Sequence, residues 1–259
     1  MSDELVRYEV RPPAVVLTMN RPDKRNALSR ALIAALCSAF ERARDDSAAR
    51  AVILTGADSA FCTGMDLEEL RGTLDADAGV VWDDALRLAA LYDLIYTLSK
   101  PTIAAVNGPA VAGGAGLVTV CDLALSVPGA VFGYPEVRRG LVAAMVMPHL
   151  LRHVGERAAR WLLLSGETID AGEATRIGLI NAVVPGTGRL LEAAVEWTQS
   201  LAAGGPRALA ATKELLRRFS RQALSVEEAA KASAAPRLGE ECRHGLEAFF
   251  AKRTAPWAG

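Results

Sequence analysis

The sequence predicts an α/β fold, and two observations support that prediction. Short, continuous apolar runs rich in β-branched residues recur at residues 14–19, 51–55, 102–106 and 123–127. Such runs are typical of parallel strands that are covered on both faces of a sheet. Longer segments with the spacing of helices separate these runs. Alternation of strands and helices is typical of right-handed β–α crossover connections.

Two helices are expected between the apolar runs. Residues 29–44 place apolar side chains at helical spacing, and the Ser29 hydroxyl is suited to cap the helix N-terminus. Residues 80–98 predict a second helix. This helix must end before Pro101, because a proline disfavours the helical conformation of the residue that precedes it. Residues 117–120 are a further, shorter helix candidate.

The second half of the chain has a mostly helical pattern, with one short strand expected at residues 181–184. The turn Gly204-Gly205-Pro206 is our candidate boundary, because these residue types interrupt regular structure. It divides a predicted α/β core, residues 1–203, from a predicted C-terminal helical region, residues 204–259. The expected helices are 145–154, 157–164, 170–177, 188–203, 206–220, 225–235 and 237–251.

The composition argues against several classes of protein. The 259 residues include 29 basic and 30 acidic side chains, so a net charge of −1 predicts no nucleic-acid surface. The N-terminus shows no secretory signal, and no apolar run reaches the ~18 residues that a membrane span needs. We therefore expect a cytoplasmic protein whose four scattered cysteines are reduced and buried.

A glycine-rich turn follows the apolar run at residues 102–106. Gly113 and Gly114 carry no Cβ, so a ligand can approach their backbone closely. A helix that begins there points free N–H groups and its positive dipole end at such a ligand, which suits a developing oxyanion. Glu136 lies twenty residues after Gly116, among apolar residues. An oxyanion site with one carboxylate can move a proton next to a carbonyl group.

The same residues also allow simpler interpretations. Gly113 and Gly114 could form a tight turn without a ligand, and Glu136 could pair with Arg138 or Arg139 on a solvated loop. A dinucleotide site is not indicated, because the G-x-G-x-x-G pattern is missing. The G-x-S-x-G pattern of serine hydrolases is missing too.

Several groups of residues, in order along nearly the whole chain, resemble the crotonase superfamily, which is also called the enoyl-CoA hydratase/isomerase family. No single group is specific, but their order makes a chance match improbable. The resemblance implies a spiral of ββα units with a C-terminal helical trimerisation region, assembled as a homotrimer or homohexamer. The matching groups are Asn20-Arg21-Pro22, Asn26-Ala27-Leu28, Ala60 to Asp66, Gly113-Gly114, Pro135-Glu136, Leu164 to Glu167, Gly178 to Asn181 and Phe249 to Arg253.

The resemblance implies chemistry on an acyl-CoA substrate. Coenzyme A is then part of the substrate, and neither a separate cofactor nor a metal ion is implied. The N–H groups of Met65 and Gly113 would hold the thioester oxygen, with Met65 in the first turn of a helix. Glu136 would be the single general acid/base. Removal of one oxyanion donor can lower a rate by about 10²–10³.

Residues next to Met65 are implied in acyl-CoA binding. In the family, the positions of Asp66, Leu67 and Glu68 contact the CoA ligand. Asp66 also has another interpretation, which we favour: Asp66 and Glu69 have the spacing of a capping box. Lys252 matches a basic position that can reach a CoA phosphate, often across a subunit boundary, although a cation also suits a helix end.

Gly116 departs from the pattern of the family hydratases. They have a second glutamate at this position, and the two carboxylates hold one water molecule. Glycine cannot do so, whereas moving a double bond from C3–C4 to C2–C3 needs only one base. We therefore favour Δ3,Δ2-enoyl-CoA isomerisation by Glu136, with enoyl-CoA hydration as the next alternative.

Two further alternatives remain open. The first is another enolate-forming reaction, such as thioester hydrolysis, decarboxylation or dehalogenation, in which Tyr134, Arg138 or His149 would point at the thioester. The second is a non-catalytic relative that binds CoA esters or RNA. The near-neutral charge and the presence of Glu136 count against the second alternative.

Two patterns near residue 150 are weaker signals. His149 and His153 have the i, i+4 spacing of zinc ligands, but no third ligand is evident, so structural or surface histidines are favoured. The methionine-containing stretch 142–150 predicts either an apolar acyl pocket or ordinary core, and core is favoured because methionine fills irregular gaps.

Overall fold

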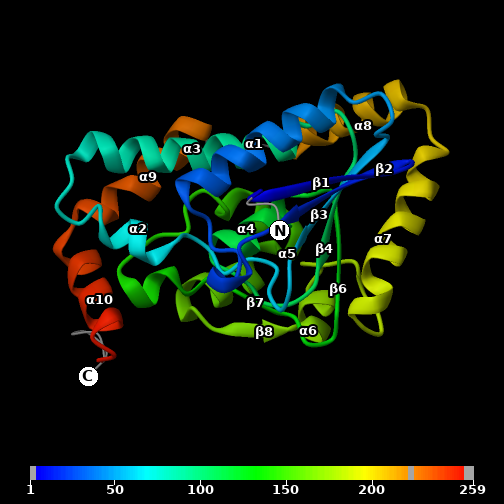
Figure 1. Ribbon diagram of the computed structural model, residues 1–259. Coiled ribbons are helices and arrows are strands. Elements are labelled where there is room, and N and C mark those ends of the chain that lie inside the picture. Colours follow the sequence, from blue (N-terminus) through cyan, green and yellow to red (C-terminus); the bar gives the residue numbers. More distant parts are fainter. Residues whose placement is uncertain (1–3, 221–224, 254–259) are drawn as a thin grey trace.

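The computed structural model describes residues 4–220 and 225–253, and its centre is a six-stranded sheet (Figure 1). The strand order is β1-β2-β3-β4-β6-β9, in which β1 and β2 pair antiparallel and all other neighbours pair parallel. Parallel neighbours need crossover connections, which confirms the α/β class. The strands of this sheet are β1 (Val6–Arg11), β2 (Ala14–Met19), β3 (Ala51–Gly56), β4 (Thr102–Val106), β6 (Leu123–Ser126) and β9 (Ala182–Val183).

A second, three-stranded sheet has the order β5-β7-β8. It consists of β5 (Ala110–Val111), β7 (Val131–Gly133) and β8 (Thr168–Asp170). A single bridge between Cys62 and Ala110 joins β5 to the segment that follows β3. The small sheet therefore lies next to the glycine-rich turn that precedes α4.

Local sequence explains where the longer helices begin and break. Ser29 caps α1, because its hydroxyl accepts a hydrogen bond from the Leu32 N–H at 3.1 Å. Gly155 adopts φ 70° and ψ 170° inside α5, at the break predicted between residues 145–154 and 157–164. The helices are α1 (Arg30–Asp45), α2 (Leu67–Arg71), α3 (Ala78–Thr97), α4 (Gly113–Val120), α5 (Met147–Ser165), α6 (Ala171–Arg176), α7 (Thr187–Ala202), α8 (Pro206–Phe219), α9 (Val226–Ala234) and α10 (Glu240–Phe250), with 3₁₀ helices η1 (Pro22–Lys24), η2 (Pro135–Arg139) and η3 (Ala235–Leu238).

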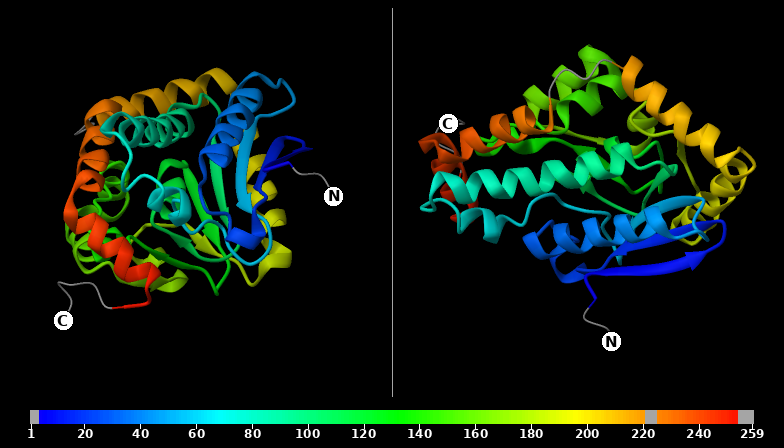
Figure 2. Two further views of the ribbon diagram at one scale, coloured as in Figure 1. Left: turned by 60° about the vertical axis from the view of Figure 1, so that its left-hand side comes forward. Right: turned by 90° about the horizontal axis from the view of Figure 1, so that it is seen from above.

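The hydrophobic core surrounds the central parallel strands. Every residue of β3 and β4 is buried, as their continuous apolar sequences predict. Helix α7 packs on β3, β4 and β6, and α1 packs on β1, β2 and α3. Figure 2 shows these helices around the sheet from two further directions.

The C-terminal helices pack on the α/β core of the same chain. Helix α9 packs along α3, as the views in Figure 2 also show, and α10 packs against η2. Leu70 of α2 forms a small buried cluster with Cys242 and Leu246 of α10, and Leu141 packs against it. The C-terminal region therefore contacts two segments that border the site described below.

Strand β1 and the strands of the small sheet were not predicted from the sequence. The sequence of β1, Val-Arg-Tyr-Glu-Val-Arg, alternates apolar and charged residues, and only Val6 in it is buried. The strands β5, β7 and β8 have three residues at most, too few to show a period. Among the described residues, no helix is both long and apolar enough to cross a membrane.

Candidate active site

Two turns of the backbone meet at the start of α4. Gly64 has φ 89°, and Ala112, which directly precedes α4, has φ 52° and ψ −126°. A Cβ built on Gly64 would lie 2.8 Å from the Ala112 Cβ and 3.2 Å from the Gly113 nitrogen. Only glycine fits this contact. Because of this contact, the Gly64–Met65 peptide lies next to the Gly113 N–H, which is the first N–H group of α4.

The backbone around these turns leaves two N–H groups free. Leu28 donates its N–H to the Gly64 carbonyl at 2.7 Å and accepts from the Asp66 N–H at 3.0 Å. The intervening Met65 N–H and the Gly113 N–H have no acceptor among the described residues. Both residues line the same pocket. The predicted pair of donors is therefore available to a ligand.

Met65 does not lie in the first turn of a helix, so that detail of the prediction is wrong. Helix α2 begins at Leu67, and Asp66 is its N-cap. Met65 instead forms a single parallel bridge with Leu28. The bridge uses the Gly64 carbonyl and the Asp66 N–H, on either side of Met65, so the Met65 N–H is free for a reason other than helix geometry.

Glu136 is an enclosed carboxylate in η2. Its Oε2 atom is buried and has no hydrogen-bond partner among the described residues. Burial raises the pKa of Glu136 to about 7, because a charged carboxylate loses its hydration there, while the positive charge of Arg139 opposes this effect. At neutral pH, such a group can both accept and donate a proton.

The nearby arginines do not form ion pairs with Glu136. Arg138 donates to the Ser165 carbonyl at 3.2 Å, and Arg139 donates to the Pro135 carbonyl at 3.4 Å. The Arg139 guanidinium also lies 4.7 Å from the centre of the Phe249 ring. The interpretation of Glu136 as an arginine-paired loop residue is therefore not supported by the described contacts.

Tyr92 occupies the space beside Gly116. A Cβ on Gly116 would meet the Tyr92 hydroxyl at 2.5 Å and would contact the Val146 side chain still more closely. The Tyr92 hydroxyl donates to the Gly113 carbonyl at 2.7 Å, which fixes it in place. The position at which the resemblance implies a second glutamate in hydratases is thus filled by a phenol and a methyl group of other residues.

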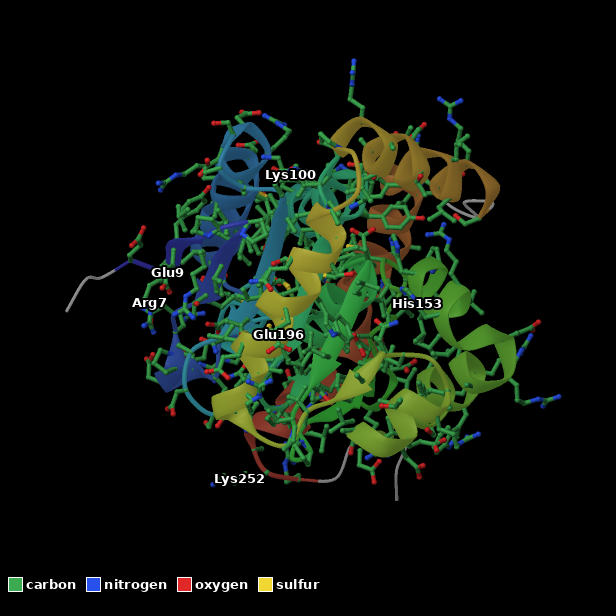
Figure 3. All side chains as sticks on the ribbon, turned by 90° about the vertical axis from the view of Figure 1, so that its right-hand side faces the viewer. Arg7, Glu9, Lys100, His153, Glu196 and Lys252 are labelled. Carbon is green, nitrogen blue, oxygen red and sulfur yellow. The ribbon has the colours of Figure 1, made fainter. Side chains whose placement is uncertain are left out.

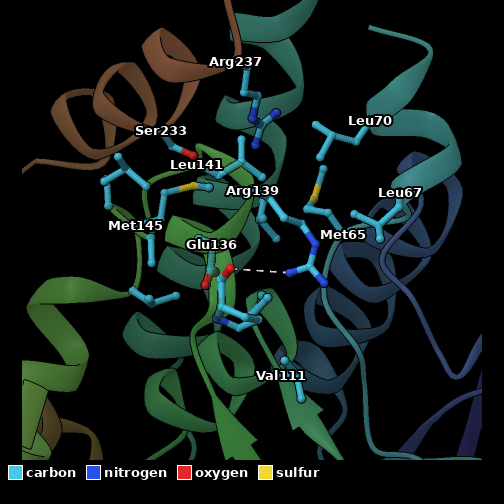
Figure 4. Close-up of a pocket in the computed structure, with 18 of the residues that line it drawn as sticks. Met65, Leu67, Leu70, Val111, Glu136, Arg139, Leu141, Met145, Ser233 and Arg237 are labelled. Atoms are coloured by element: carbon cyan, nitrogen blue, oxygen red, sulfur yellow. Dashed lines mark hydrogen bonds between the residues drawn. The ribbon is translucent and has the colours of Figure 1, made fainter. Parts of the chain in front are cut away.

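The pocket combines these groups with apolar walls (Figure 4). Its empty space of about 780 Å³ includes open solvent at the mouth. A mostly apolar lining with a few polar groups is typical of small-molecule sites. Residues 142–146 line the pocket, while Met145, Val146 and Leu150 also belong to the hydrophobic core, so each of the two interpretations of the stretch 142–150 holds in part. The other lining residues include Met65, Leu67, Leu70, Leu88, Tyr92, Gly113, Glu136, Arg139, Leu141, Ser233 and Arg237.

Of the residues predicted to bind the CoA ligand, some line the pocket and others lie outside it. Leu67 lines the pocket, whereas Asp66 caps α2 and pairs with Arg21 at 2.9 Å. Glu68 pairs with Lys24 at 2.9 Å on the surface. Lys252 is exposed, just beyond α10 (Figure 3). It does not line the pocket. The roles of Asp66, Glu68 and Lys252 in binding stay predictions.

The residues named for other reactions lie outside the pocket lining. His149 packs edge-on against Tyr96, and burial lowers the pKa of His149 to about 3. His153 is hydrogen-bonded to the Thr119 carbonyl at 2.9 Å. Tyr134 is fully buried and, like Arg138 and His149, does not line the pocket. In the described part of the chain, no three potential metal ligands cluster.

Sequence reasoning missed several polar residues of the pocket. Tyr92 lies in a helix that was predicted, but nothing in its spacing shows that its hydroxyl reaches the start of α4. Ser233 and Arg237 come from the C-terminal helical region, far along the chain from Glu136. Their place in the pocket depends on how α9 and η3 pack, which one sequence does not indicate.

Comparisons with known proteins identify the family of the chain. The family model for enoyl-CoA hydratase/isomerase matches residues 13–259. A Thermus thermophilus protein with the provisional name enoyl-CoA hydratase is 41% identical over 96% of this chain and 98% of its own length. The 2,3-dehydroadipyl-CoA hydratase of Escherichia coli is 34% identical over 100% of both chains.

Solved structures show the same fold. An enoyl-CoA hydratase from Mycobacterium avium superposes with a TM-score of 0.84 at 35% identity, covering 99% of this chain and 100% of that one. An enoyl-CoA hydratase/isomerase from Xanthobacter autotrophicus Py2 gives a TM-score of 0.87 at 29% identity, covering 98% of each chain. The α/β fold is therefore of the crotonase type, as the resemblance implied. The chain belongs to the enoyl-CoA hydratase/isomerase family and is an acyl-CoA enzyme of that superfamily.

Proposed function

We propose that this enzyme isomerises 3-enoyl-CoA to 2-enoyl-CoA with Glu136 as its single general acid/base. The observation that supports this proposal most directly is the enclosed Oε2 of Glu136, which has no described partner. The carboxylate shares one pocket with the free N–H groups of Met65 and Gly113. A base and two oxyanion donors are the groups that proton transfer next to a thioester needs.

In the proposed reaction, the thioester oxygen accepts hydrogen bonds from the N–H groups of Met65 and Gly113. Glu136, as a carboxylate, removes a proton from C2, and the C–H electron pair moves into a dienolate whose negative charge reaches the thioester oxygen. The protonated Glu136 then returns the proton to C4. The double bond moves from C3–C4 to C2–C3, and no atom is added or lost.

The space beside Gly116 favours isomerisation over hydration. Hydration requires a water molecule that is held and activated next to C3, and one carboxylate is poorly equipped to do both. The Tyr92 hydroxyl and Val146 fill the place where a second carboxylate would begin. The proposed isomerisation involves no water, so this crowding does not hinder it.

Hydration of 2-enoyl-CoA is the second candidate, and the names of the relatives favour it. Both the Thermus thermophilus and the Escherichia coli relatives are named hydratases. If this enzyme hydrates efficiently, then Glu136 must activate water alone or with the Tyr92 hydroxyl. The Tyr92 hydroxyl already donates its proton to the Gly113 carbonyl. It can therefore still accept a hydrogen bond through its oxygen, but it has no further proton to donate.

Other parts of the proposal concern binding and assembly. Met65 and Leu67 contact the acyl-CoA, and Lys252 reaches a CoA phosphate, with no separate cofactor or metal ion. The enzyme is proposed to be a cytoplasmic homotrimer or homohexamer that binds neither nucleic acid nor membrane. Apolar side chains exposed in the single chain, such as Leu164, Leu215 and Leu216, support burial between subunits.

A paired assay with purified protein tests the reaction. We expect 3-hexenoyl-CoA to gain the absorbance of a conjugated thioester rapidly, and crotonyl-CoA to lose it slowly. Rapid loss from crotonyl-CoA without isomerisation would instead establish hydration. Neither activity, together with no thermal shift from CoA esters, would favour a non-catalytic relative.

The variant Glu136→Gln tests the proton transfer itself. Glutamine keeps the shape but cannot accept the proton, so we expect turnover to fall by about 10²–10⁴-fold. Binding of saturated acyl-CoA should persist, because the N–H groups of Met65 and Gly113 are unchanged. Glu173→Gln, on the surface of α6, is the matched control and should retain activity. Wild-type turnover in Glu136→Gln would exclude the role proposed for Glu136.

A further inference from the structure

The Arg237 guanidinium is buried in the pocket and has no hydrogen-bond partner among the residues that the structure describes. Arg237 lies in η3 and is only 7% exposed. Its Nη1 atom is enclosed and makes no hydrogen bond to any described residue. Figure 4 shows the side chain pointing from η3 into the pocket. A buried cation is unfavourable unless an anion or several acceptors surround it, so this group has an unused capacity to bind an anion.

The acid that interacts electrostatically with Arg237 is already bound by other cations. Asp84 of α3 is 5% exposed and attracts Arg237. Arg30 donates two hydrogen bonds to Asp84 at 2.7 Å and 2.6 Å, and Arg87 donates another at 3.0 Å. No ion pair between Asp84 and Arg237 is formed in the described structure. Asp84 therefore does not neutralise the pocket.

The pocket lining as a whole is positively charged. It contains two arginines, Arg139 and Arg237, and one acid, Glu136. The Nε atom of Arg139 is also enclosed without a described partner. Because the pKa of Glu136 is about 7, its carboxyl group is neutral for part of the time at neutral pH. An anion entering between the two guanidiniums would find complementary charge.

The position of Arg237 indicates the part of the substrate that it meets. Arg237 shares the pocket with Leu88, Tyr92 and Met145. Arg237 and Ser233 both come from the C-terminal helical region. Figure 4 shows Arg237 and Val111 on opposite sides of Glu136. The phosphates of CoA are separated from the thioester by the pantetheine arm and carry several charges, so they suit an exposed surface better than this enclosed pocket.

We propose that Arg237, with the neighbouring Ser233 hydroxyl, binds a carboxylate at the far end of the acyl chain. The favoured substrates would then be CoA monothioesters of unsaturated dicarboxylic acids rather than methyl-terminated enoyl-CoA. This inference rests on the proposed function, because it assumes that the thioester lies at Met65 and Gly113. The guanidinium would donate two hydrogen bonds to the carboxylate, an arrangement that arginine forms readily.

Binding of saturated thioesters separates this proposal from the proposed reaction. Adipoyl-CoA and hexanoyl-CoA have the same chain length and differ in a terminal carboxylate or methyl group, and neither has a double bond to isomerise. We expect calorimetry on the wild type to show at least about 10-fold tighter binding of adipoyl-CoA, as is typical of a charge-assisted hydrogen bond. Glutaryl-CoA with pentanoyl-CoA, and pimeloyl-CoA with heptanoyl-CoA, extend the comparison to other lengths.

The variant Arg237→Met assigns the preference to one residue. We expect it to lose the preference for the carboxylate at every length and to bind hexanoyl-CoA at least as well as the wild type, which also shows that it is folded. Arg237→Lys should keep part of the preference. Arg160→Met removes one exposed charge elsewhere and should keep all of it.

Three outcomes would overturn the proposal. The first is equal or weaker binding of the dicarboxylic thioesters by the wild type at every length. The second is an unchanged preference in Arg237→Met. The third is equal loss of affinity for both kinds of thioester, which would mean that Arg237 binds a CoA phosphate. The isomerisation assay does not depend on any of these outcomes, so the two proposals can fail separately.

Discussion

At the scale of single residues, Glu136 links activity to stability. Its enclosure raises the pKa from 4.5 to about 7, so the folded protein holds this proton more tightly than the unfolded chain does. Between about pH 4.5 and about pH 7, the native state therefore binds more protons than the unfolded chain does. The free energy of unfolding falls as the pH rises through this range. The same enclosure that suits the group to proton transfer makes the native state less stable at high pH.

The variant Glu136→Gln should remove this pH dependence. We expect its stability relative to the wild type to rise by roughly 2–3 kcal/mol between about pH 5 and about pH 8, because only the wild type has to lose the proton. Urea unfolding of both proteins across this range measures the difference. Parallel curves for the two proteins would mean that Glu136 is ionised at little cost in the native state.

Gly116 is a second residue at which a small change should have a large effect. Gly116→Ala places a methyl group against the Tyr92 hydroxyl and Val146, so we expect a loss of about 1–3 kcal/mol in the free energy of unfolding. Gly129→Ala is the control, because a Cβ there meets nothing within 4 Å. If Tyr92→Phe, which removes the contacting oxygen, does not reduce the loss in the double variant, then crowding by Tyr92 is not its cause.

At the scale of elements, α10 supports both sides of the pocket. Leu246 is fully buried and packs with Leu70 of α2, while Leu141 follows η2 on the other side. Arg243 adds a hydrogen bond to the Leu74 carbonyl at 2.7 Å and an ion pair with Asp75 at 2.9 Å. The last described helix thus holds together segments that are far apart in the sequence.

Truncation of Leu246 should show that this support matters. We expect Leu246→Ala to lower the free energy of unfolding by about 2–4 kcal/mol, as is usual for a buried leucine, and to raise KM. Chemical denaturation and steady-state kinetics measure the two effects. Glu247→Ala, one residue further on and exposed, should leave both unchanged. Normal stability in Leu246→Ala would show that α10 is not tightly packed on α2.

The elements also show which parts of the fold and of the site can be predicted from the sequence. The four longer parallel strands and the main helices follow from continuous apolar runs and helical spacing, which are local patterns. Met65, Gly113 and Glu136 lie in short motifs, and the structure places all three in one pocket. Tyr92 and Arg237 have no such motif. Their side chains reach the pocket through packing between distant helices, which local patterns do not indicate.

At the scale of the whole molecule, the state of assembly is the main expectation. One chain has a mass of 27.4 kDa, so light scattering should give about three or six times that value if the proposed homotrimer or homohexamer forms. Trp161 and Leu164 of α5 and Leu215 and Leu216 of α8 are exposed in the single chain and are candidates for burial between subunits. A monomer at micromolar concentration would contradict this expectation.

The position of Ser233 and Arg237 in the pocket affects how the enzyme matures during synthesis. The backbone donors at Met65 and Gly113 and the carboxylate of Glu136 leave the ribosome first, since chains emerge from their N-terminus and domains fold as units. Ser233 and Arg237, which form one wall of the pocket, and Leu246, which supports the pocket, are translated about a hundred residues after Glu136. A chain released from a ribosome that stalls before residue 233 would contain the proton-transfer groups. It would lack Ser233 and Arg237, so its acyl pocket would be open to solvent.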